Sequence, residues 1–329
     1  MSKSSFGSNG DPRCSGTDLT PVDLSVVIVS WNVCELLRRC LQSVLAAPIR
    51  LEVIVVDNAS SDGTTAMVAT EYPEIQLVVN SRNVGFPAAN NQGIALASGR
   101  TVLLLNPDTE IVGDALATLV AYADAHADVG LVGPQLLNPD GSVQPSRRRF
   151  PTLATAFFES TWLQQWAPRS VVRDYYVLDR SDDVTQDVDW VFGAAMLVKR
   201  EVLDQVGVLD EGYFMYSEEL DWCRRIRTAG WRVVYLPAAR VVHHGGKSSE
   251  QVVAERHIHF QTSKVRYFRI YHGAIASEAI RLFLLASYVV QVALEGMKWL
   301  VGHKRPLRAD RISAYRQVLR SRLRPGTVV

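Results

Sequence analysis

The chain has 329 residues, of which 47% are hydrophobic and 21% charged, and its formal net charge is +1. This composition excludes an intrinsically disordered protein and leaves room for one large domain or two medium ones. The four cysteines form no CxxC pair, which argues against a zinc site or a thioredoxin-like motif. No basic start followed by an apolar core opens the sequence, so we expect a reduced, cytoplasmic protein.

The first half alternates between buried-strand and amphipathic-helix patterns, after a Ser-, Gly-, Asp- and Pro-rich stretch at 1–22 that we expect to be a disordered lead-in. Strands are predicted at 24–30, 51–56 (ending at Asp57), 75–79 and 102–105, and helices at 35–45, about 64–71, 91–97 and 113–125. The alternation predicts an α/β fold whose parallel sheet is covered by helices on both faces.

The second half has a less regular pattern. Residues 189–199 are predicted as one strand with Gly193 inside it, and residues 214–228 as a loop entering a helix that stops near Gly230. Two further short strands are predicted at 233–236 and 239–243. A long apolar helix at 275–301 and a basic tail complete the chain.

Polar residues follow three of the predicted strands, at Ser30, Asp57 and 106–108. Ligands of parallel sheets bind outside the carboxyl ends of the strands. Asp57 is therefore a candidate to accept hydrogen bonds from a ribose or a base edge. The alternative is a helix N-cap, a role for which Asp62 is also suited.

Asp108 follows the buried run LLLNP, and Pro107 fixes the backbone just before it. Mg²⁺ takes one or two protein carboxylates and completes its shell with phosphate and water. Asp108 is therefore predicted to bind a divalent cation that neutralises a diphosphate, the alternative being a cap on the following helix. His243, at a predicted strand end, is the candidate second ligand through its imidazole, with His244 as the alternative.

Two other segments carry candidate chemistry. The stretch NSRNVGFPAANNQG at 80–93 supplies backbone amides around Gly85, although alone it also fits a turn and a helix cap. Glu218, Glu219 and Asp221 lie within four positions, and like charges this close raise a carboxyl pKa, which suits a general base. A solvated acidic first turn of a helix is the alternative, and the aromatic residues around the acids favour a packed site.

In chain order the motifs are SVVIVSWN, VVDNASSDGT, NVGFPAANNQG, LLLNPD, WVFGAAMLVKR, FMYSEELDWCRR, GWRVVYLP and VVHHGG. Together they resemble the family 2 inverting glycosyltransferases of the GT-A fold, and within that family a rhamnosyltransferase-like branch. The resemblance covers roughly 24–246. It implies a Rossmann-like mixed sheet flanked by helices, the fold of nucleotide-diphospho-sugar transferases, with a C-terminal helical extension.

The resemblance also implies a division of the chain and roles for its residues. It predicts a catalytic domain at 23–272, with a nucleotide-binding half at about 23–112 and an acceptor half at about 113–272, followed by an apolar helix and basic tail at 273–329. Asp108 matches the last acid of the family's Asp-x-Asp motif and His243 the histidine that completes the metal shell. Glu219 falls at the catalytic base, where many relatives have Asp, and Asp221 and Glu218 are second choices. The expected contacts to the nucleotide sugar are Ser30, Asn32, Asp57, Asn83, Gly85, Asn91 and Asn106, the last standing at the motif's first acidic position.

These assignments predict a metal-dependent inverting glycosyltransferase that uses Mg²⁺ or Mn²⁺. The donor is expected to be a dTDP-sugar, rhamnose first, or a UDP-sugar, and the acceptor a glycan or lipid-linked hydroxyl in cell-surface polysaccharide synthesis. A nucleotidyltransferase is one alternative, but SWNVCELLRRC is not the Gly-rich basic phosphate loop that such chemistry favours. An inactive sugar-nucleotide-binding, membrane-associated assembly factor is the other, and the acids and His243 argue against it. No nucleic-acid partner is expected, and a homodimer is left open.

The C-terminal segment suggests a membrane surface. Residues 280–301 are long enough for a transmembrane helix, but Arg281, Gln291, Glu295 and Lys298 argue against a clean span. The basic stretch that follows suits an anionic bilayer, so peripheral attachment at the cytoplasmic face of the inner membrane is favoured. The alternatives are packing on the catalytic domain or on a second subunit, and a true span.

Overall fold

The first strand sets the frame of the fold. The computed structural model describes residues 22–159, 161–245 and 252–324, so nearly all of the expected lead-in lies outside the described residues. β1 (Leu24–Ser30) is buried along its whole length because β2 (Leu51–Asp57) and β4 (Thr101–Leu105) flank it in parallel register. A Val- and Ile-rich strand of this kind suits a position covered on both faces.

The central sheet is mixed, with the strand order β3-β2-β1-β4-β11-β6-β12-β5. β3 (Gln76–Val79) continues the parallel half, whereas β11 (Ala195–Lys199) pairs antiparallel with both β4 and β6 (Val129–Leu137). β12 (Arg232–His243) runs parallel to β6, and β5 (Thr109–Val112) pairs antiparallel with β12. The predicted mixed sheet is therefore confirmed.

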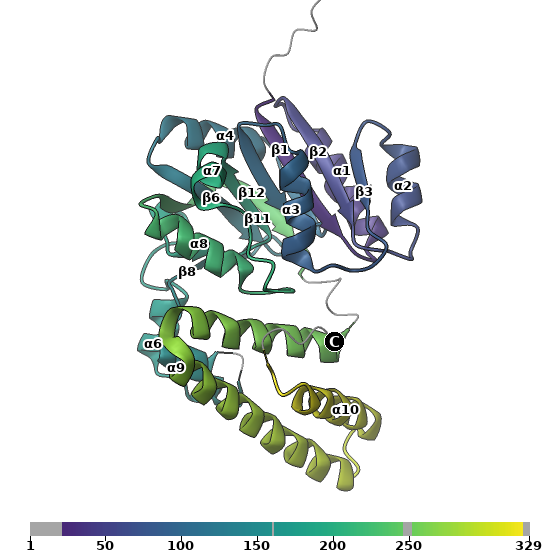
Figure 1. Ribbon diagram of the computed structural model, residues 1–329, viewed down its shortest axis with the longest axis vertical. Helices are drawn as coiled ribbons and strands as arrows, with labels where there is room; N and C mark the ends of the chain where they lie inside the picture. Colours follow the sequence, from purple (N-terminus) through teal and green to yellow (C-terminus); the bar gives the residue numbers. More distant parts are fainter. Residues whose placement is uncertain (1–21, 160, 246–251, 325–329) are drawn as a thin grey trace, which may run out of the picture.

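The strand directions bring the carboxyl ends of β1, β2, β4 and β12 to one edge of the sheet. β12 reaches this edge because two antiparallel steps, through β11, restore the direction of β1. In Figure 1 the chain enters β1 at the top, so this edge faces the helical layer below. Ser30, Asp57, Asn106 and His243 thus come from distant parts of the sequence to the same edge.

Helices cover both faces of the sheet, so that alternate residues of β1 belong to different cores. Val27 and Val29 pack in one hydrophobic cluster, and Val26 and Ile28 in the other. The helices of this α/β domain are α1 (Cys34–Leu45), α2 (Thr64–Glu71), α3 (Phe86–Leu96), α4 (Ala115–Ala125), α7 (Arg200–Val206) and α8 (Glu218–Thr228).

Short elements connect the sheet to the helical layer beneath it. They are β7 (Val143–Gln144), β8 (Arg147–Arg148), β9 (Gln186–Asp187) and β10 (Trp190–Val191), with the helices α5 (Leu153–Phe158), η1 (Trp162–Trp166) and α6 (Arg169–Tyr175). β8 and β10 form a separate two-stranded sheet, which lies where the domain meets α6 and α9 (Figure 1).

Several of the predicted elements differ from the structure. The strand at 189–199 is interrupted, because β10 leaves the main sheet to pair with β8 and only β11 continues in it. The two strands predicted at 233–236 and 239–243 are one strand, β12. Its register against β6 shifts around Pro237, which has no backbone N–H to donate to the neighbouring strand. The helix predicted to begin at Asn91 begins at Phe86, where Gly85 (φ 92°) ends the preceding loop and Pro87 occupies the first turn.

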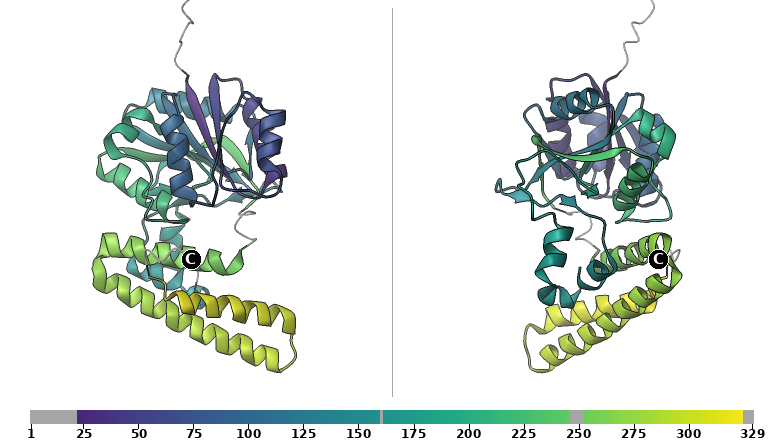
Figure 2. Two further views of the ribbon diagram at one scale, coloured as in Figure 1. Left: turned by 45° about the vertical axis from the view of Figure 1, so that its right-hand side comes forward. Right: turned by 90° about the vertical axis from the view of Figure 1, so that its left-hand side faces the viewer.

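The chain ends in a helical layer below the sheet (Figures 1 and 2). α9 (Val253–Leu300) begins earlier than the predicted apolar helix and is broken at Gly273, whose φ of 85° lies in the left-handed region. The break creates two arms, and the second packs against α10 (Arg305–Ser321). The proposed division of the chain near residue 272 stays a prediction, although the break lies beside it.

Candidate functional site

Three side-chain oxygens at the carboxyl edge of the sheet have no hydrogen-bond partner among the described residues. They are Ser30 Oγ, Asp57 Oδ1 and Asn106 Oδ1, and all three atoms are buried. A buried polar atom without a partner costs about 1–3 kcal/mol, so such a group at one edge indicates a site that a polar ligand completes. These are three of the residues predicted to contact the nucleotide sugar.

The loop after β2 is held by Asp57 and Asn32. Asp57 Oδ2 accepts a hydrogen bond from the Ser60 amide at 2.9 Å, and Asn32 Oδ1 accepts one from the Ser61 amide at 2.7 Å. Helix α2 begins at Thr64, whose amide bonds Asp62 Oδ1 at 3.2 Å. Asp62 therefore serves the helix start, and one oxygen of Asp57 is left facing the edge of the sheet.

Asn58, which the sequence analysis missed, organises the next loop. Its side-chain amide donates to Asn83 Oδ1 at 3.1 Å and to the Gly85 carbonyl at 3.2 Å, and its oxygen accepts from Asn80 at 3.0 Å. Asn91 is used differently, because its amide group bonds both ways with the backbone of Leu209. The structure thus gives Asn83 and Asn91 roles in holding loops in place.

Asp108 and His243 are brought together by the β5–β12 ladder. His243 pairs with Thr109, the residue after Asp108, and the His244 amide donates to the Asp108 carbonyl at 2.8 Å. His243 Nε2 lies 3.4 Å from Asp108 Oδ1, and both residues are buried. His244, the alternative ligand, instead contacts Glu110 Oε1 at 2.7 Å.

Gln144 fixes the tautomer of His243. The Gln144 side-chain nitrogen donates to Asn138 Oδ1 at 3.1 Å, so its oxygen is the atom that faces His243 Nδ1 at 2.7 Å. Nδ1 must then carry the proton in the neutral ring, and Nε2 presents a lone pair toward Asp108. Gln144 is a second residue that the sequence analysis missed.

This arrangement fits a divalent cation. A carboxylate oxygen and an imidazole lone pair face each other, and His243 Nε2 has no hydrogen-bond partner among the described residues. Two ligands that each lie about 2.1 Å from one ion are typically about 3 Å apart. No cluster of three or more His, Cys, Asp or Glu residues is found in the described part of the chain, so the rest of the shell would come from ligand and water.

The acids of α8 are buried at its first turn. Tyr216 (φ 70°) and Ser217 (φ 66°) are both left-handed, and such backbone strain in non-glycine residues is concentrated at functional sites. The alternative of a solvated acidic turn is wrong, because Glu218, Glu219 and Asp221 are all less than 10% exposed.

Burial separates the two glutamates from ordinary carboxylates. It raises the pKa of Glu219 to about 7, and burial together with the neighbouring Glu219 raises the pKa of Glu218 well above its usual range. One side-chain oxygen of each has no partner among the described residues. Glu219 is therefore poised to exchange a proton near neutral pH, and the surroundings of Glu218 favour its protonated form.

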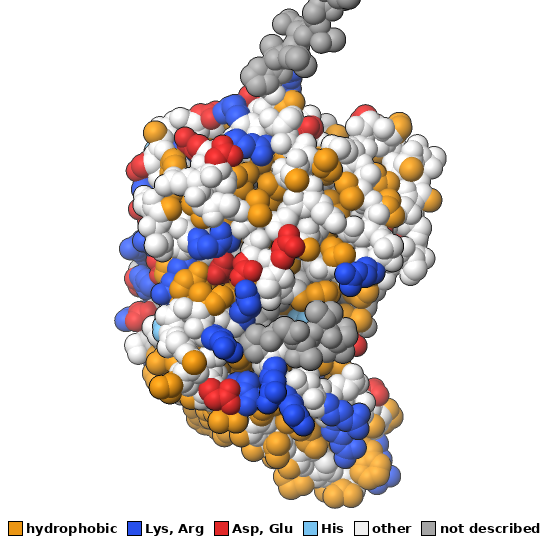
Figure 3. Space-filling model, in the orientation of Figure 1, with side chains coloured by type: hydrophobic (Ala, Val, Ile, Leu, Met, Phe, Trp, Pro, Cys, Tyr) orange, Lys and Arg blue, Asp and Glu red, His pale blue; other side chains and the backbone are white. Residues whose placement is uncertain are grey.

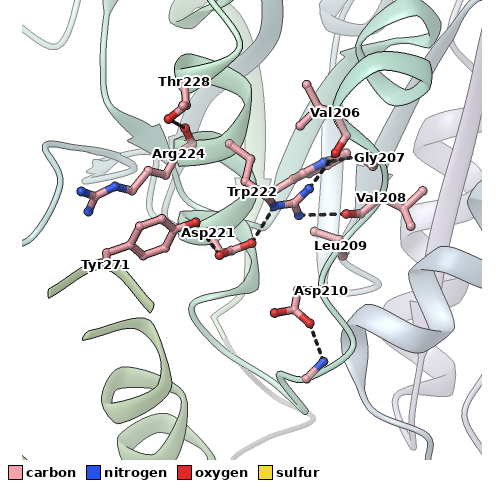
Figure 4. A network of polar contacts seen from close by, with 12 residues as sticks. Val206, Gly207, Val208, Leu209, Asp210, Asp221, Trp222, Arg224, Thr228 and Tyr271 are labelled. Carbon is pink, nitrogen blue, oxygen red and sulfur yellow. Dashed lines mark hydrogen bonds and ion pairs between the residues drawn. The ribbon is translucent and has the colours of Figure 1, made fainter. Parts of the chain in front are cut away.

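Asp221 has a different environment from the glutamates. Arg225 Nε donates to one of its oxygens at 2.9 Å and the Tyr271 hydroxyl donates to the other at 2.7 Å (Figure 4). Arg225 also bonds the carbonyls of Val206 and Val208. With both oxygens occupied, Asp221 ties α8 to α9 and to the preceding loop.

The interrupted strand connects the acids to the Asp108–His243 pair. The Glu219 side chain lies against Gly193, where an added Cβ would meet three of its carbons at 3.5 Å. The ring of the adjacent Phe192 lies 5.8 Å from that of His243. Residues 192–193 thus touch both groups, which places a raised-pKa carboxyl and a candidate cation site around one short loop.

Comparison with known proteins adds to this geometry. Residues 21–257 match the family model described as glycosyltransferase like family 2. The N-acetylglucosaminyl-diphospho-decaprenol L-rhamnosyltransferase of Mycobacterium tuberculosis is 33% identical over 245 residues, covering 71% of this chain and 78% of that protein. Rhamnosyltransferase WbbL of Escherichia coli K12 is 28% identical over 227 residues, covering 67% and 82%.

Two solved structures are similar to the whole fold. A mannosyltransferase from Pyrobaculum calidifontis, in complex with GDP-Man and Mn²⁺, has a TM-score of 0.53 at 19% identity and covers 93% of this chain and 90% of its own. GalNAc-T7 with UDP, GalNAc and Mn²⁺ has a TM-score of 0.55 at 16% identity, covering 91% and 56%. At these identities the likeness concerns the fold alone.

Proposed function

Since the chain belongs to glycosyltransferase like family 2, as a rhamnosyltransferase-like enzyme of the GT-A fold, we propose that it moves rhamnose from a nucleoside-diphosphate donor to a lipid-linked acceptor with inversion. The observation that carries the proposal is Glu219, a buried carboxyl with a pKa of about 7 that shares one short loop with the Asp108–His243 pair. The donor is proposed to be dTDP-rhamnose, with a UDP-sugar as the second choice.

An inverting transfer is a single displacement at the anomeric carbon. Glu219 takes the proton of the acceptor hydroxyl while the oxygen of that hydroxyl bonds to the anomeric carbon. The bond from this carbon to the donor diphosphate breaks, and the diphosphate leaves with the electron pair. Ser30, Asp57 and Asn106 offer their unpartnered oxygens to the nucleoside. Burial and the neighbouring Glu219 raise the pKa of Glu218, which disfavours a second negative charge beside the base.

The metal-binding role falls to Asp108 and His243. A divalent cation bound there would stabilise the negative charge that develops on the departing diphosphate. Mn²⁺ in the complexes of both structural relatives supports this proposal. Gln144 holds the imidazole so that Nε2 faces the cation site, a type of support on which metal affinity depends.

The acceptor is proposed to be a sugar carried on a lipid diphosphate. The name of the mycobacterial relative specifies such an acceptor, and the chain covers 78% of that protein. The second arm of α9 offers a surface suited to a membrane that carries it. By length and composition α9 could cross a membrane, but Gly273 interrupts it and its second arm packs against α10.

The second arm of α9 buries polar as well as apolar residues and exposes an apolar stripe. Its polar residues Ser277, Ser287 and Glu295 are buried, and Glu295 pairs with Arg308 of α10 at 2.7 Å. Its outward face carries an uncharged stripe, spaced three or four residues apart: Ile275, Ala279, Leu282, Ala286, Val289, Ala293, Met297 and Leu300. We define these eight residues as the outer stripe.

Basic residues accompany the outer stripe. Figure 3 shows hydrophobic side chains along the lower edge of the molecule over α9 and Lys and Arg side chains over α10. A groove of about 710 Å³ on α10 is lined by Trp299 together with Arg316 and Arg320. Apolar contact flanked by cations suits the surface of an anionic bilayer, so we propose peripheral attachment through this layer.

The test of the proposed function is rhamnose transfer by the purified chain. With dTDP-rhamnose, Mn²⁺ and N-acetylglucosaminyl diphosphate on a short lipid, a rhamnosylated product with inverted configuration is expected. Glu219→Gln should abolish transfer and leave dTDP binding unchanged, because it removes the base and retains the side-chain volume. Full turnover by this variant would place the base elsewhere, and a wild-type chain inactive with every rhamnose donor would overturn the proposed donor.

A further inference from the structure

The segment Gln144–Arg148 runs from the cation site toward the helical layer. Gln144 contacts His243, the Ser146 carbonyl accepts from the Phe192 amide at 2.8 Å, and Arg148 pairs with Trp190 in the β8–β10 ladder. Alternate residues of an extended segment share a face. Gln144, Ser146 and Arg148 are the alternate residues of this segment, and we call them the polar row.

Arg147, between two members of the polar row, makes several contacts of its own with other parts of the chain. Its guanidinium bonds the carbonyls of Ser181 and Arg180 and pairs with Asp182 at 2.7 Å, and it lies over the ring of Tyr235. The contrast between neighbouring arginines is informative, because Arg147 has the carboxylate that a buried cation ordinarily requires.

Arg148 has no such carboxylate in the part of the chain that the structure describes. Its guanidinium lies 4.3 Å from the ring centre of Tyr176, and its hydrogen bond goes to the Arg147 carbonyl at 2.9 Å. Burial lowers its pKa, so the surroundings disfavour the charged form of this side chain. A planar guanidinium whose only hydrogen bond among the described residues uses one nitrogen has further donors with which it can bind an anion in a bidentate way.

The carboxylate that acts on Arg148, that of Glu159, is already paired with another cation. Glu159 influences Arg148 electrostatically, but Lys264 of α9 pairs with its carboxylate at 3.1 Å and the Tyr175 hydroxyl donates to it at 3.0 Å. Arg148 and Lys264 against Glu159 leave one positive charge in this cluster. An anion brought by a ligand is the partner that this surplus charge fits.

The position of the surplus charge relative to Glu219 identifies the kind of anion. Gly193, which touches Glu219, lies three residues beyond Trp190, the partner of Arg148, so their backbones are at most about 10 Å apart. Between them Ser146, which is 2% exposed, has an Oγ without a partner among the described residues. The row therefore begins within about the length of one sugar with its phosphate from the loop that touches the base.

We propose that Arg148, with Ser146 beside it, binds the diphosphate of the lipid-linked acceptor and so selects sugars that are carried on a diphosphate. This inference rests on the proposed function. The acceptor sugar then lies at Glu219, its diphosphate at Arg148, and its lipid continues toward the helical layer, to which Lys264 and Glu159 connect the cluster. The donor diphosphate stays at the Asp108–His243 pair.

The experiment compares Arg148→Gln with the wild type, using farnesyl diphosphate, farnesol and dTDP as inhibitors of rhamnose transfer. Loss of a charge-assisted, bidentate contact should weaken inhibition by farnesyl diphosphate about 30- to 100-fold. Inhibition by farnesol and by dTDP should not change. Arg173→Gln is the matched control, because Arg173 lies on nearby α6, is 58% exposed and pairs only with Asp174 among the described residues.

Each outcome decides the proposal. Unchanged inhibition by farnesyl diphosphate overturns it, and a parallel loss for dTDP also overturns it, because Arg148 would then serve the donor. If Arg148→Gln does not fold, Arg148→Lys keeps the charge without the planar fork and should weaken inhibition by farnesyl diphosphate alone, by a smaller factor. Direct binding of the three probes to wild type and variants decides the point even if no rhamnose is transferred, so this inference and the proposed function fail separately.

Discussion

His243 Nε2 faces Asp108 Oδ1 at 3.4 Å with no proton between them when the ring is neutral, because Gln144 holds the proton on Nδ1. Two buried electron-rich atoms in this arrangement repel each other unless a cation or a second proton lies between them. This geometry supports the proposal that the two side chains bind one divalent cation, and substitutions at either residue test it.

Removing either ligand should weaken Mn²⁺ binding. Asp108→Asn keeps the shape but removes the charge, and His243→Ala removes the imidazole, so each variant should bind Mn²⁺ at least tenfold more weakly in the presence of dTDP. Titration calorimetry with the wild type and the two variants measures this. His244→Ala is the control, since His244 contacts Glu110 instead of Asp108 through its side chain; equal affinity in all four proteins would refute the assignment.

Gln144 should act on the cation only through His243. Gln144→Leu removes the acceptor for the Nδ1 proton, so Mn²⁺ affinity should fall about 10- to 100-fold. Gln144→Glu retains an acceptor oxygen and should restore most of the affinity. A loss of affinity that Gln144→Glu does not rescue would mean that the residue contributes only to folding, which a thermal melt of the same samples would reveal. Gln165→Leu, an exposed site on η1, is the control.

The pH dependence of turnover should report the pKa of Glu219. Because burial raises this pKa to about 7, the base form is lost as the pH falls below neutrality. The value of kcat/KM should therefore drop about tenfold per unit below pH 7 and level off above it. A profile that stays flat from pH 5 to 8 would exclude Glu219 as the base, provided that Mn²⁺ is saturating throughout.

The same raised pKa makes Glu219 destabilising at high pH. Below about pH 4.5 the carboxyl is protonated in both states, and between 4.5 and 7 the unfolded chain loses its proton first, so folding becomes less favourable as the pH rises. The 2.5-unit difference sets an upper limit of about 3 kcal/mol above pH 7. Glu219→Gln should thus raise the free energy of unfolding at pH 8 and change it little near pH 4.5.

Urea titrations at the two pH values measure this difference. Glu74→Gln on the surface is the control, because it removes a carboxyl from an exposed position. A Glu219→Gln variant that is destabilised at pH 8 would show that the side chain holds the fold together in its ionised form, contrary to the argument from burial.

Charges placed on the outer stripe should release the protein from membranes. Leu282→Glu with Val289→Glu puts two carboxylates into the apolar contact, so binding to vesicles of phosphatidylglycerol and phosphatidylcholine should weaken more than tenfold. Sedimentation with vesicles measures the bound fraction. Leu178→Glu, at another exposed apolar residue, is the control. If the wild type does not bind vesicles and the stripe variant is a monomer where the wild type is a dimer, membrane attachment is refuted. A second copy of the chain then covers the outer stripe.

The regular half of the fold follows from the sequence because its signals are local. The run of apolar residues at 24–30 and the spacing of Leu37, Cys40, Leu41 and Val44 need no tertiary information. The segment 189–199 is predicted as one strand because its apolar residues form a nearly continuous run. Its interruption depends on the pairing of β10 with the two-residue strand β8, which the run does not reveal. The first arm of α9 was missed because its buried residues, such as Lys264, mix polar and apolar types.

The site was predictable to the extent that its residues stand in motifs. Asp108, Glu219 and His243 were singled out by their place in the sequence and by resemblance, and the structure adds their burial and partners. Asn58 and Gln144 could not be found, since the role of each is set by a contact with a residue 25 or more positions away. Asp221 was equally acidic in sequence, and only its bonds to Arg225 and Tyr271 distinguish it from the glutamates.

The β5–β12 ladder has a consequence for the order in which the protein is made. Thr109 is translated long before its ladder partner, His243, so the early strands can assemble on the ribosome while the final ligand is still unsynthesised. An arrested chain that ends before β12 therefore has the aspartate and lacks the imidazole. On the proposed assignment, the cation site is complete only when β12 has joined the sheet. A chain truncated before β12 would then bind no manganese there and would not consume the donor sugar.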